Sequence, residues 1–317
     1  NVFNIQTPVA ICIAVREGKK DKETAAPVRY AAIRGTREEK YAKLAAIKSF
    51  ADLKWKTCPT GWHAPLRPTG SGPYFAWPLL ADLMPWQQSG QEIKRSWPIG
   101  PDEETLRRRW KSLLRDWKGS ERANAFKETR DRKVTGTYPG LLRSQEPGKP
   151  VSTLPAGTNM PRAQRIAFRS FDRQYAIADN RVGDYFRPSL WEAHRSGKQV
   201  YLATLTTEPL SGGAALVAAC EIPDRHYFNG RGGKDISPLY RDAAGAEPNI
   251  LPGFLALWGK KLKREITPEP FAAYVYALLG HAGFVERFWD ELEDCQLRIP
   301  LVLDAKLFDK AVDAGAR

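Results

Sequence analysis

Apolar and arginine residues alternate along residues 165–181, and this pattern restricts the local structure more than any other stretch of the chain. An alternation with a period of two is typical of a half-buried strand pair that presents charge on one face. A continuous apolar run at residues 199–205 predicts a further strand. The alternating apolar residues are Ile166, Phe168, Phe171, Tyr175 and Ile177, and the arginines among them are Arg165, Arg169, Arg173 and Arg181.

A sheet that holds a row of arginines in fixed geometry suits an extended anionic ligand. The planar guanidinium group can form two parallel hydrogen bonds to a phosphate or to a guanine edge. A second interpretation is that the arginines form an ordinary solvated basic face. The residues of this stretch leave both interpretations open.

The charge of the whole chain also favours a polyanionic partner. Its 317 residues include 49 lysines and arginines against 36 aspartates and glutamates, which gives a formal net charge of +13. Nucleic acid is the commonest partner of such a chain, and an anionic membrane surface is the alternative. No run of about 18 apolar residues is present to span a bilayer. We therefore expect double-stranded DNA as the partner and no membrane.

The arginine-rich stretch also carries a recognisable order of residues. They are Arg169, Phe171, Asp172, Arg173, Asp179, Asn180, Arg181, Arg187, Pro188, Leu190 and Trp191. This run resembles a segment of the C-terminal specificity domain of Type ISP restriction-modification enzymes, single-chain bacterial enzymes that also carry an adenine methyltransferase. Ser170 stands where that pattern usually has proline. Shorter pieces resemble the same family, in the same order, at residues 1–15, 34–40, 89–95, 238–250, 274–279 and 298–301.

The resemblance implies an α+β fold, with a mixed sheet, flanking helices and long loops rich in proline and glycine. Residues 1–52 would be a β-hairpin and helix from the end of the methyltransferase domain. Residues 53–317 would be the DNA target-recognition domain, with possible lobes at 53–150 and 151–317. Because Asn1 stands in place of methionine, we expect a fragment.

The intact enzyme, as the resemblance implies, would methylate an adenine amino group with S-adenosylmethionine after flipping the base out of the duplex. It would couple site recognition to translocation and cleavage driven by ATP and magnesium, through methyltransferase and motor domains of the same polypeptide. We expect it in the bacterial cytoplasm, because Cys12, Cys58, Cys220 and Cys295 follow no disulfide framework.

The residues of this fragment predict no catalytic site or cofactor of its own. The tetrapeptide of amino-group methyltransferases contains two adjacent prolines, and this chain has no such pair. No Gly-x-Ser-x-Gly elbow is present. The four histidines are isolated from one another, so a metal site is not expected. They are His63, His194, His226 and His281.

Local signals predict several further elements. Apolar residues 9–15 and 28–33 predict a hairpin. Thr36 and Glu39 have the spacing of a capping box, which starts a helix. The other predicted elements are helices at residues 101–117 and 119–133, a surface connection at 134–159, a strand at 216–222, and helices from Thr267, near Phe284 and from Asp304. Seven tryptophans at residues 55–117 are expected to pack a loop-rich region rather than to stack on paired bases.

Two loops are further candidates for DNA contact. The loop at residues 89–95 is polar and ends in two cations, and the loop at 224–235 is basic and rich in glycine. The second is not a phosphate-binding P-loop, because Phe228 and Asp235 stand where that motif needs glycine and serine or threonine. A mobile surface loop is its other interpretation. The candidate contact residues are Ser89, Gly90, Lys94 and Arg95 in the first loop and Arg231 and Lys234 in the second.

Two hypotheses follow for the function. In the first, the chain is a sequence-specific DNA-recognition module that positions a target adenine, with some arginines on base edges and some on phosphates. In the second, the arginines are neutralised by acids such as Asp172, Asp179 and Asp184, and the domain is a scaffold between motor and methyltransferase. The arginines in question are Arg169, Arg173, Arg181 and Arg187.

Overall fold

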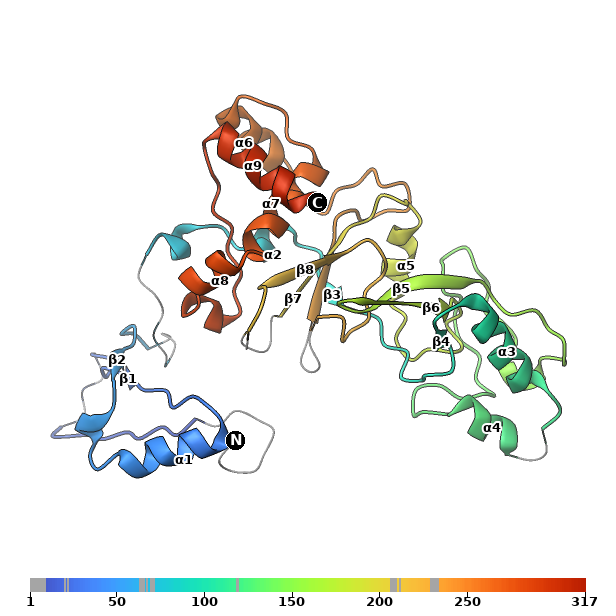
Figure 1. Cartoon of the computed structure of the whole chain (residues 1–317), viewed down its shortest axis with the longest axis horizontal. Coiled ribbons are helices and arrows are strands. Elements are labelled where there is room, and N and C mark those ends of the chain that lie inside the picture. Colours follow the sequence, from blue (N-terminus) through green and yellow to red (C-terminus); the bar gives the residue numbers. More distant parts are fainter. Residues whose placement is uncertain are drawn as a thin grey trace. The chain divides into compact units, whose positions relative to one another are not determined.

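The computed structural model describes residues 10–19, 21, 23–62, 66, 68, 72–117, 120–205, 210, 212–228 and 234–317. The chain divides into two compact units, Asn1–Gly72 and Pro73–Arg317 (Figure 1). The predicted boundary between residues 52 and 53 falls inside the first unit, and the assignment of residues 1–52 to a methyltransferase stays a prediction. No helix in the described ranges is long and apolar enough to cross a membrane.

The described residues of the first unit contain one helix of more than a single turn, α1 (Arg37–Ala46). The capping box that the sequence predicts is present at its start: the Glu39 N–H donates to Oγ1 of Thr36, and the Thr36 N–H donates to the Glu39 carboxylate. Strand β1 (Arg29–Tyr30) pairs antiparallel with β2 (Lys56–Thr57).

The hairpin predicted from residues 9–15 and 28–33 is wrong, because residues 10–17 contain no strand. Arg29–Tyr30 finds its partner at Lys56–Thr57 instead. An apolar segment becomes a stable strand only where a neighbouring strand and a core receive it. Cys58 is the only buried residue among the described residues of this unit, so these residues form no core that could receive the segment. The side chains left exposed are Ile11, Ile13 and Val15.

Two antiparallel sheets organise the second unit, and this confirms the α+β class (Figure 1). The strands thus fall into separate sheets rather than one mixed sheet. The first sheet has the order β3-β9-β7-β8 and consists of β3 (Gln88–Ser89), β9 (Lys234–Pro238), β7 (Tyr201–Leu205) and β8 (Leu216–Ala219). The second has the order β4-β6-β5 and consists of β4 (Ile99–Gly100), β6 (Asp172–Ile177) and β5 (Ala163–Arg169).

The arginine-rich stretch forms the predicted strand pair, the β5–β6 hairpin. Its register places Arg169 opposite Asp172, with a bulge between Ala167 and Arg169. Only two residues therefore connect the strands, and Phe171 is one of them. Phe171 is fully exposed at this turn, whereas the sequence pattern placed it on the apolar face of a strand.

Strand β7 lies between the two hydrophobic cores of the second unit. Leu202 packs in one core, while Tyr201 and Ala203 pack in the other. Because successive side chains of a strand point to opposite faces, both faces of β7 are buried, which explains its continuous apolar sequence. The possible lobes at residues 53–150 and 151–317 both contribute to the second core.

Helices cover the two cores. The first core is closed by α6 (Phe254–Leu262), α7 (Pro268–Leu279) and α9 (Ala305–Gly315), where Trp258 packs edge-on against Tyr274 and Phe308. The second core receives the apolar faces of α3 (Glu103–Leu114) and α5 (Pro188–His194). The α-helices of the second unit are α2 (Leu80–Leu83), α3 (Glu103–Leu114), α4 (Glu121–Phe126), α5 (Pro188–His194), α6 (Phe254–Leu262), α7 (Pro268–Leu279), α8 (Ala282–Arg287) and α9 (Ala305–Gly315). Short 3-10 turns are η1 (Phe50–Asp52), η2 (Pro73–Ala76), η3 (Val151–Thr153) and η4 (Glu291–Asp294).

The predicted helices at residues 101–117, from Thr267 and from Asp304 are confirmed. Asp102 caps α3 by accepting the Thr105 N–H at 2.7 Å. The helix predicted at 119–133 is shorter, since Lys127 adopts a left-handed conformation and ends α4. The connection at 134–159 contains only a 3-10 turn, but it also packs into the second core. Its buried residues are Val134, Leu141 and Val151.

Candidate nucleic-acid interface

Three loop segments run beside strand β5 and form one backbone unit, here called the three-segment frame. They are residues 89–95, 184–187 and 222–227. Backbone hydrogen bonds of 2.7–3.1 Å join residues 184–187 to 89–95, residues 89–95 to 222–227, and residues 222–227 to β5. The bonded pairs are Glu92 with Tyr185, Gln91 with Pro223 and Arg225, and Ala167 with Ile222 and Asp224. Side chains on the frame therefore start from fixed backbone positions, although the segments are loops.

Gly90 makes the close approach within the frame possible. A Cβ atom at this position would lie 2.9 Å from backbone atoms of Asp224 and Arg225, which is closer than such atoms can approach. Ser89 ends strand β3, and its hydroxyl lies 3.5 Å from the Gly90 carbonyl. Packing thus explains the glycine, and DNA contact by Ser89 and Gly90 stays a prediction.

The side chain of Arg95, which the sequence predicted as a contact residue, is buried, and its contact with DNA stays a prediction. It is 4% exposed, and its Nη1 donates to the Asp184 carboxylate at 2.7 Å. Further bonds go to the carbonyls of Lys127 and Val182. Burial lowers the pKa of Arg95, and Asp184 partly offsets this effect. The polar loop sequence gave no sign of this inward orientation, because Asp184 lies far along the chain.

Lys94 stays accessible, and it lies over an aromatic ring that the sequence reasoning missed. Its Nζ is 4.8 Å from the ring centre of Tyr185, and 3.6 Å from the Asp131 carboxylate. The Tyr185 hydroxyl donates to the same carboxylate at 2.8 Å. Hydrogen bonds from Arg130, and then from Tyr185, lower the pKa of Asp131 to about 2. Asp131 is thus ionised at neutral pH and holds Lys94 and Tyr185 in place.

Besides Arg95, three of the predicted contact arginines form ion pairs. Arg169 bonds Asp224 at 2.7 Å, Arg173 bonds Glu221 at 3.0 Å and Arg181 bonds Asp179 at 2.5 Å. The Arg181–Asp179 pair agrees with the scaffold hypothesis. Asp172, by contrast, accepts from Gln174. The Arg169 side chain remains 44% exposed, so its ion pair leaves room for a ligand.

Arg187 differs from these arginines because no carboxylate pairs with it among the described residues. Its Nε donates to the Gly90 carbonyl at 3.4 Å, and its guanidinium lies 5.3 Å from the ring centre of Tyr185. Burial, followed by the nearby charge of Arg225, lowers its pKa. Arg225 itself bonds Glu92 at 2.9 Å, while its Nε is buried and has no hydrogen-bond partner in the described part of the chain. This Arg187–Arg225–Glu92 cluster holds two guanidinium groups against one carboxylate.

Backbone strain is also present beside the same ring. Lys94 and Arg187 both have left-handed backbone angles, with φ of 59° and 58°. Such a conformation costs roughly 1–2 kcal/mol for a residue other than glycine. The surrounding frame maintains it at two residues whose cations share the Tyr185 ring. Strain of this kind is often found at functional sites.

Glu92, Tyr185 and Arg225 were not among the residues that the sequence singled out for contact. The frame brings them together from positions that are about a hundred residues apart in the sequence. The one signal in the sequence is the closeness of Tyr185 and Arg187, an aromatic and a basic residue two positions apart. Arg231 lies outside the described residues. Lys234 begins strand β9, and its side chain also lies outside the described part.

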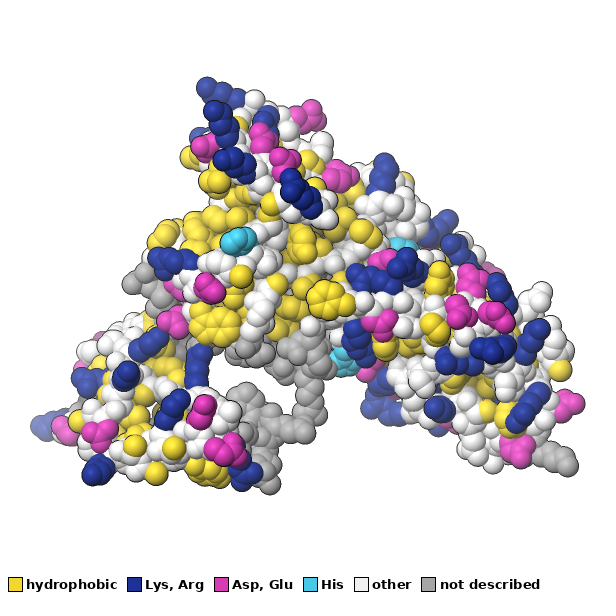
Figure 2. Space-filling model, viewed as in Figure 1, with side chains coloured by type: hydrophobic (Ala, Val, Ile, Leu, Met, Phe, Trp, Pro, Cys, Tyr) yellow, Lys and Arg dark blue, Asp and Glu magenta, His cyan; other side chains and the backbone are white. Residues whose placement is uncertain are grey.

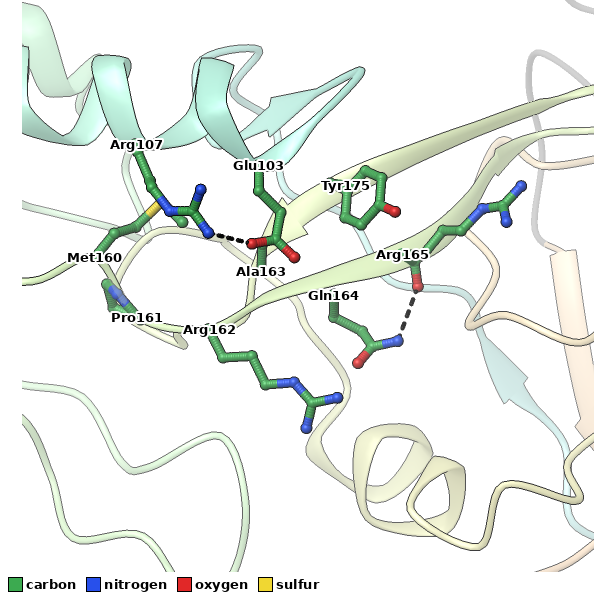
Figure 3. A pocket seen from close by; sticks show the side chains of 9 residues that line it. All are labelled: Glu103, Arg107, Met160, Pro161, Arg162, Ala163, Gln164, Arg165 and Tyr175. Atoms are coloured by element: carbon green, nitrogen blue, oxygen red, sulfur yellow. Dashed lines mark hydrogen bonds and ion pairs between the residues drawn. The ribbon is translucent and has the colours of Figure 1, made fainter.

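Basic residues also gather near α3 and the β5–β6 hairpin, where Figure 2 shows many lysine and arginine side chains on one face. A cavity of about 330 Å³ lies there, between the start of β5 and α3 (Figure 3). In it Arg107 pairs with Glu103 at 2.6 Å, and Arg162 and Arg165 are exposed. A neighbouring cavity of about 900 Å³ is lined by Arg162, Arg181 and His194 among others. Within the described ranges no three His, Cys, Asp or Glu residues lie close enough to hold a metal.

The chain belongs to the family of Type ISP C-terminal specificity domains, whose family model matches residues 82–317. None of the curated protein sequences compared matches it.

Three solved structures share the fold. A nuclease-deletion mutant of the Type ISP restriction-modification enzyme LlaGI, in complex with a DNA substrate mimic, has 15% identity and a TM-score of 0.55, over 92% of this chain and 23% of that one. The DrdV–DNA complex has 17% identity and a TM-score of 0.57, and the match covers 88% of this chain and 28% of that one. The ATP-dependent Type ISP restriction-modification enzyme LlaBIII, bound to DNA, has 13% identity and a TM-score of 0.56, and the match covers 92% of this chain and 19% of that one. The chain therefore spans less than a third of each neighbour.

Proposed function

We propose that this chain recognises a specific sequence in double-stranded DNA, as the specificity part of a restriction-modification enzyme. The family supports this proposal, and so do the neighbours with the same fold, whose structures contain DNA. The observation that carries it is the Arg187–Arg225–Glu92 cluster, in which a rigid frame holds more guanidinium groups than carboxylates. Donors fixed in this way suit hydrogen bonding to base edges and phosphates.

The ion-paired arginines would have a different task from Arg187. Arg169 and Arg173 are fixed by carboxylates and remain partly exposed, so they can bond phosphate while paired. Contacts of this kind position a protein on the duplex without reading its sequence. Lys94 would add a further phosphate contact beside the Tyr185 ring. Arg231 and Lys234 would be flanking contacts, as their basic, glycine-rich loop sequence predicts.

The intact enzyme would methylate an adenine that this domain helps to position, with S-adenosylmethionine as methyl donor, and would use ATP and magnesium for translocation. These activities would belong to methyltransferase and motor domains outside the described residues. The exposed apolar side chains of the first unit support such a neighbour, since they would be buried against the rest of a methyltransferase domain. Among them are Tyr41, Leu44 and Phe50.

The test is selection from a pool of random DNA duplexes with the 317-residue chain, followed by sequencing and by anisotropy over a salt series. We expect one short sequence to be enriched, and the logarithm of the association constant to fall linearly with the logarithm of salt concentration. Binding without enrichment would contradict sequence recognition by this chain.

A second candidate, a scaffold that couples other domains, is favoured by the neutralised arginines. Arg95, Arg169 and Arg181 are held by carboxylates, as expected of residues that maintain the fold. A scaffold would bind DNA weakly and with the same affinity for every sequence. The selection experiment therefore separates the two candidates.

A further inference from the structure

We propose that Arg187 reads a guanine in the DNA major groove, and that the Arg187–Arg225–Glu92 cluster is built to hold its guanidinium for this purpose. The inference rests on the proposed function, and it assigns one base contact to one side chain. Of the five N–H donors of Arg187, only Nε has a partner among the described residues, the Gly90 carbonyl at 3.4 Å. Both terminal nitrogens remain available for a ligand.

The orientation of this guanidinium is fixed before any ligand binds. Arg187 lies between Phe186, whose side chain is buried, and Pro188, which begins helix α5. Its left-handed backbone is held by the frame, and its planar group packs on the ring of Tyr185. Less side-chain freedom is then lost when a ligand binds.

The hydrogen-bonding groups of the cluster match a base edge. The Glu92 carboxylate is paired with Arg225, so the cluster combines one acceptor with two guanidinium groups. A guanine edge carries no net charge and presents two acceptors, O6 and N7, which match the two terminal nitrogens of arginine. Glu92 could itself accept from the amino group of a cytosine. Arg225 orients Glu92 through their 2.9 Å bond.

The experiment compares the duplex sequences selected by the unchanged chain with those selected by Arg187→Lys and Arg187→Ala. Lysine keeps the charge and loses the fork, so a phosphate contact would tolerate it, whereas a guanine contact made by two parallel donors would be weakened. We expect the preference for guanine at one position to fall about tenfold or more in both variants, while the other positions keep their preferences. The salt dependence should change little in Arg187→Lys.

Two control variants separate loss of the guanine contact from misfolding and from the loss of a nearby positive charge. Arg187→Gly, which adopts a left-handed backbone readily, should lose the same single preference in a folded chain, as checked by circular dichroism. Arg195→Ala removes an exposed arginine paired with Glu192 just after α5, and it should leave the selected sequence unchanged.

Three results would overturn the inference. One is an unchanged selected sequence in the Arg187 variants, and another is a uniform loss of affinity with a smaller salt dependence, which indicates phosphate contact. In both cases the proposed function would stand. If the unchanged chain enriches no sequence, the proposed function and this inference fall together.

Discussion

The arginines of this domain occupy two environments, and the difference decides what each substitution should do. Arg95 is enclosed and shares hydrogen bonds with Asp184 and several carbonyls, whereas Arg187 lacks a carboxylate among the described residues. The charges of neighbouring residues in the sequence do not distinguish these two arginines. They differ because the side chain of Arg95 points into the core and that of Arg187 does not.

Replacing Arg95 by alanine should destabilise the fold. The change leaves the Asp184 carboxylate buried and without its main partner, and such a loss costs roughly 3–5 kcal/mol. Urea unfolding followed by tryptophan fluorescence would measure it. As a matched control, Arg107→Ala removes an arginine from an exposed pair with Glu103 and should change the free energy of unfolding by less than about 1 kcal/mol. Equal stability of the two variants would show that the Arg95 pair has no structural role.

The sequence could predict which residue types form the candidate site, but not their partners. Arginines on a half-buried strand pair were expected, and the Asp179–Arg181 pair is local enough to be foreseen. Arg169 and Asp224, in contrast, are brought together only by the frame. A single sequence contains no information on such distant pairings, so the burial of Arg95 against Asp184 could not be predicted.

At the scale of elements, β7 is the strand on which the second unit depends most. Leu202 faces the first core, and Tyr201 and Ala203 face the second, so one short strand supports both. Its neighbours β8 and β9 are fixed by antiparallel pairing to it. Damage at β7 should therefore affect both cores together.

Leu202→Ala is expected to lower the free energy of unfolding by about 2–5 kcal/mol, through lost burial and the cavity that remains. Leu257→Ala provides the matched control, because Leu257 is 63% exposed on α6 and should change stability by about 0.5 kcal/mol or less. Thermal unfolding followed by circular dichroism and tryptophan fluorescence would compare the variants. A Leu202→Ala chain as stable as the control would mean that β7 is not a shared support.

Capped helices were easier to predict than strands in this chain. Thr36, Asp102 and Asp304 each accept a backbone N–H within the next three residues, so the signal for the helix start is contained in a few neighbouring positions. Strands depend on distant partners. The apolar residues 9–15 resembled a strand, yet the partner strand expected for them pairs elsewhere.

For the molecule as a whole, the two cores contain described residues of the second unit only. Removing residues 1–72 should therefore leave Pro73–Arg317 folded, with the same urea midpoint and the same slope as the corresponding transition of the intact chain. Circular dichroism over a urea series would test this expectation. A truncated chain that precipitates or loses its cooperative transition would show that the first unit is needed for stability.

The frame that holds Glu92, Tyr185 and Arg225 is joined by backbone atoms, and the side chains at these positions contribute nothing to those bonds. Substitution of a side chain leaves these backbone hydrogen bonds in place. Residues 92, 187 and 225 can therefore be substituted without a change in the backbone conformation of the loops. Libraries varied at these three positions should yield folded proteins at high frequency. The same arrangement would let natural relatives diverge in the DNA sites they select while keeping one scaffold.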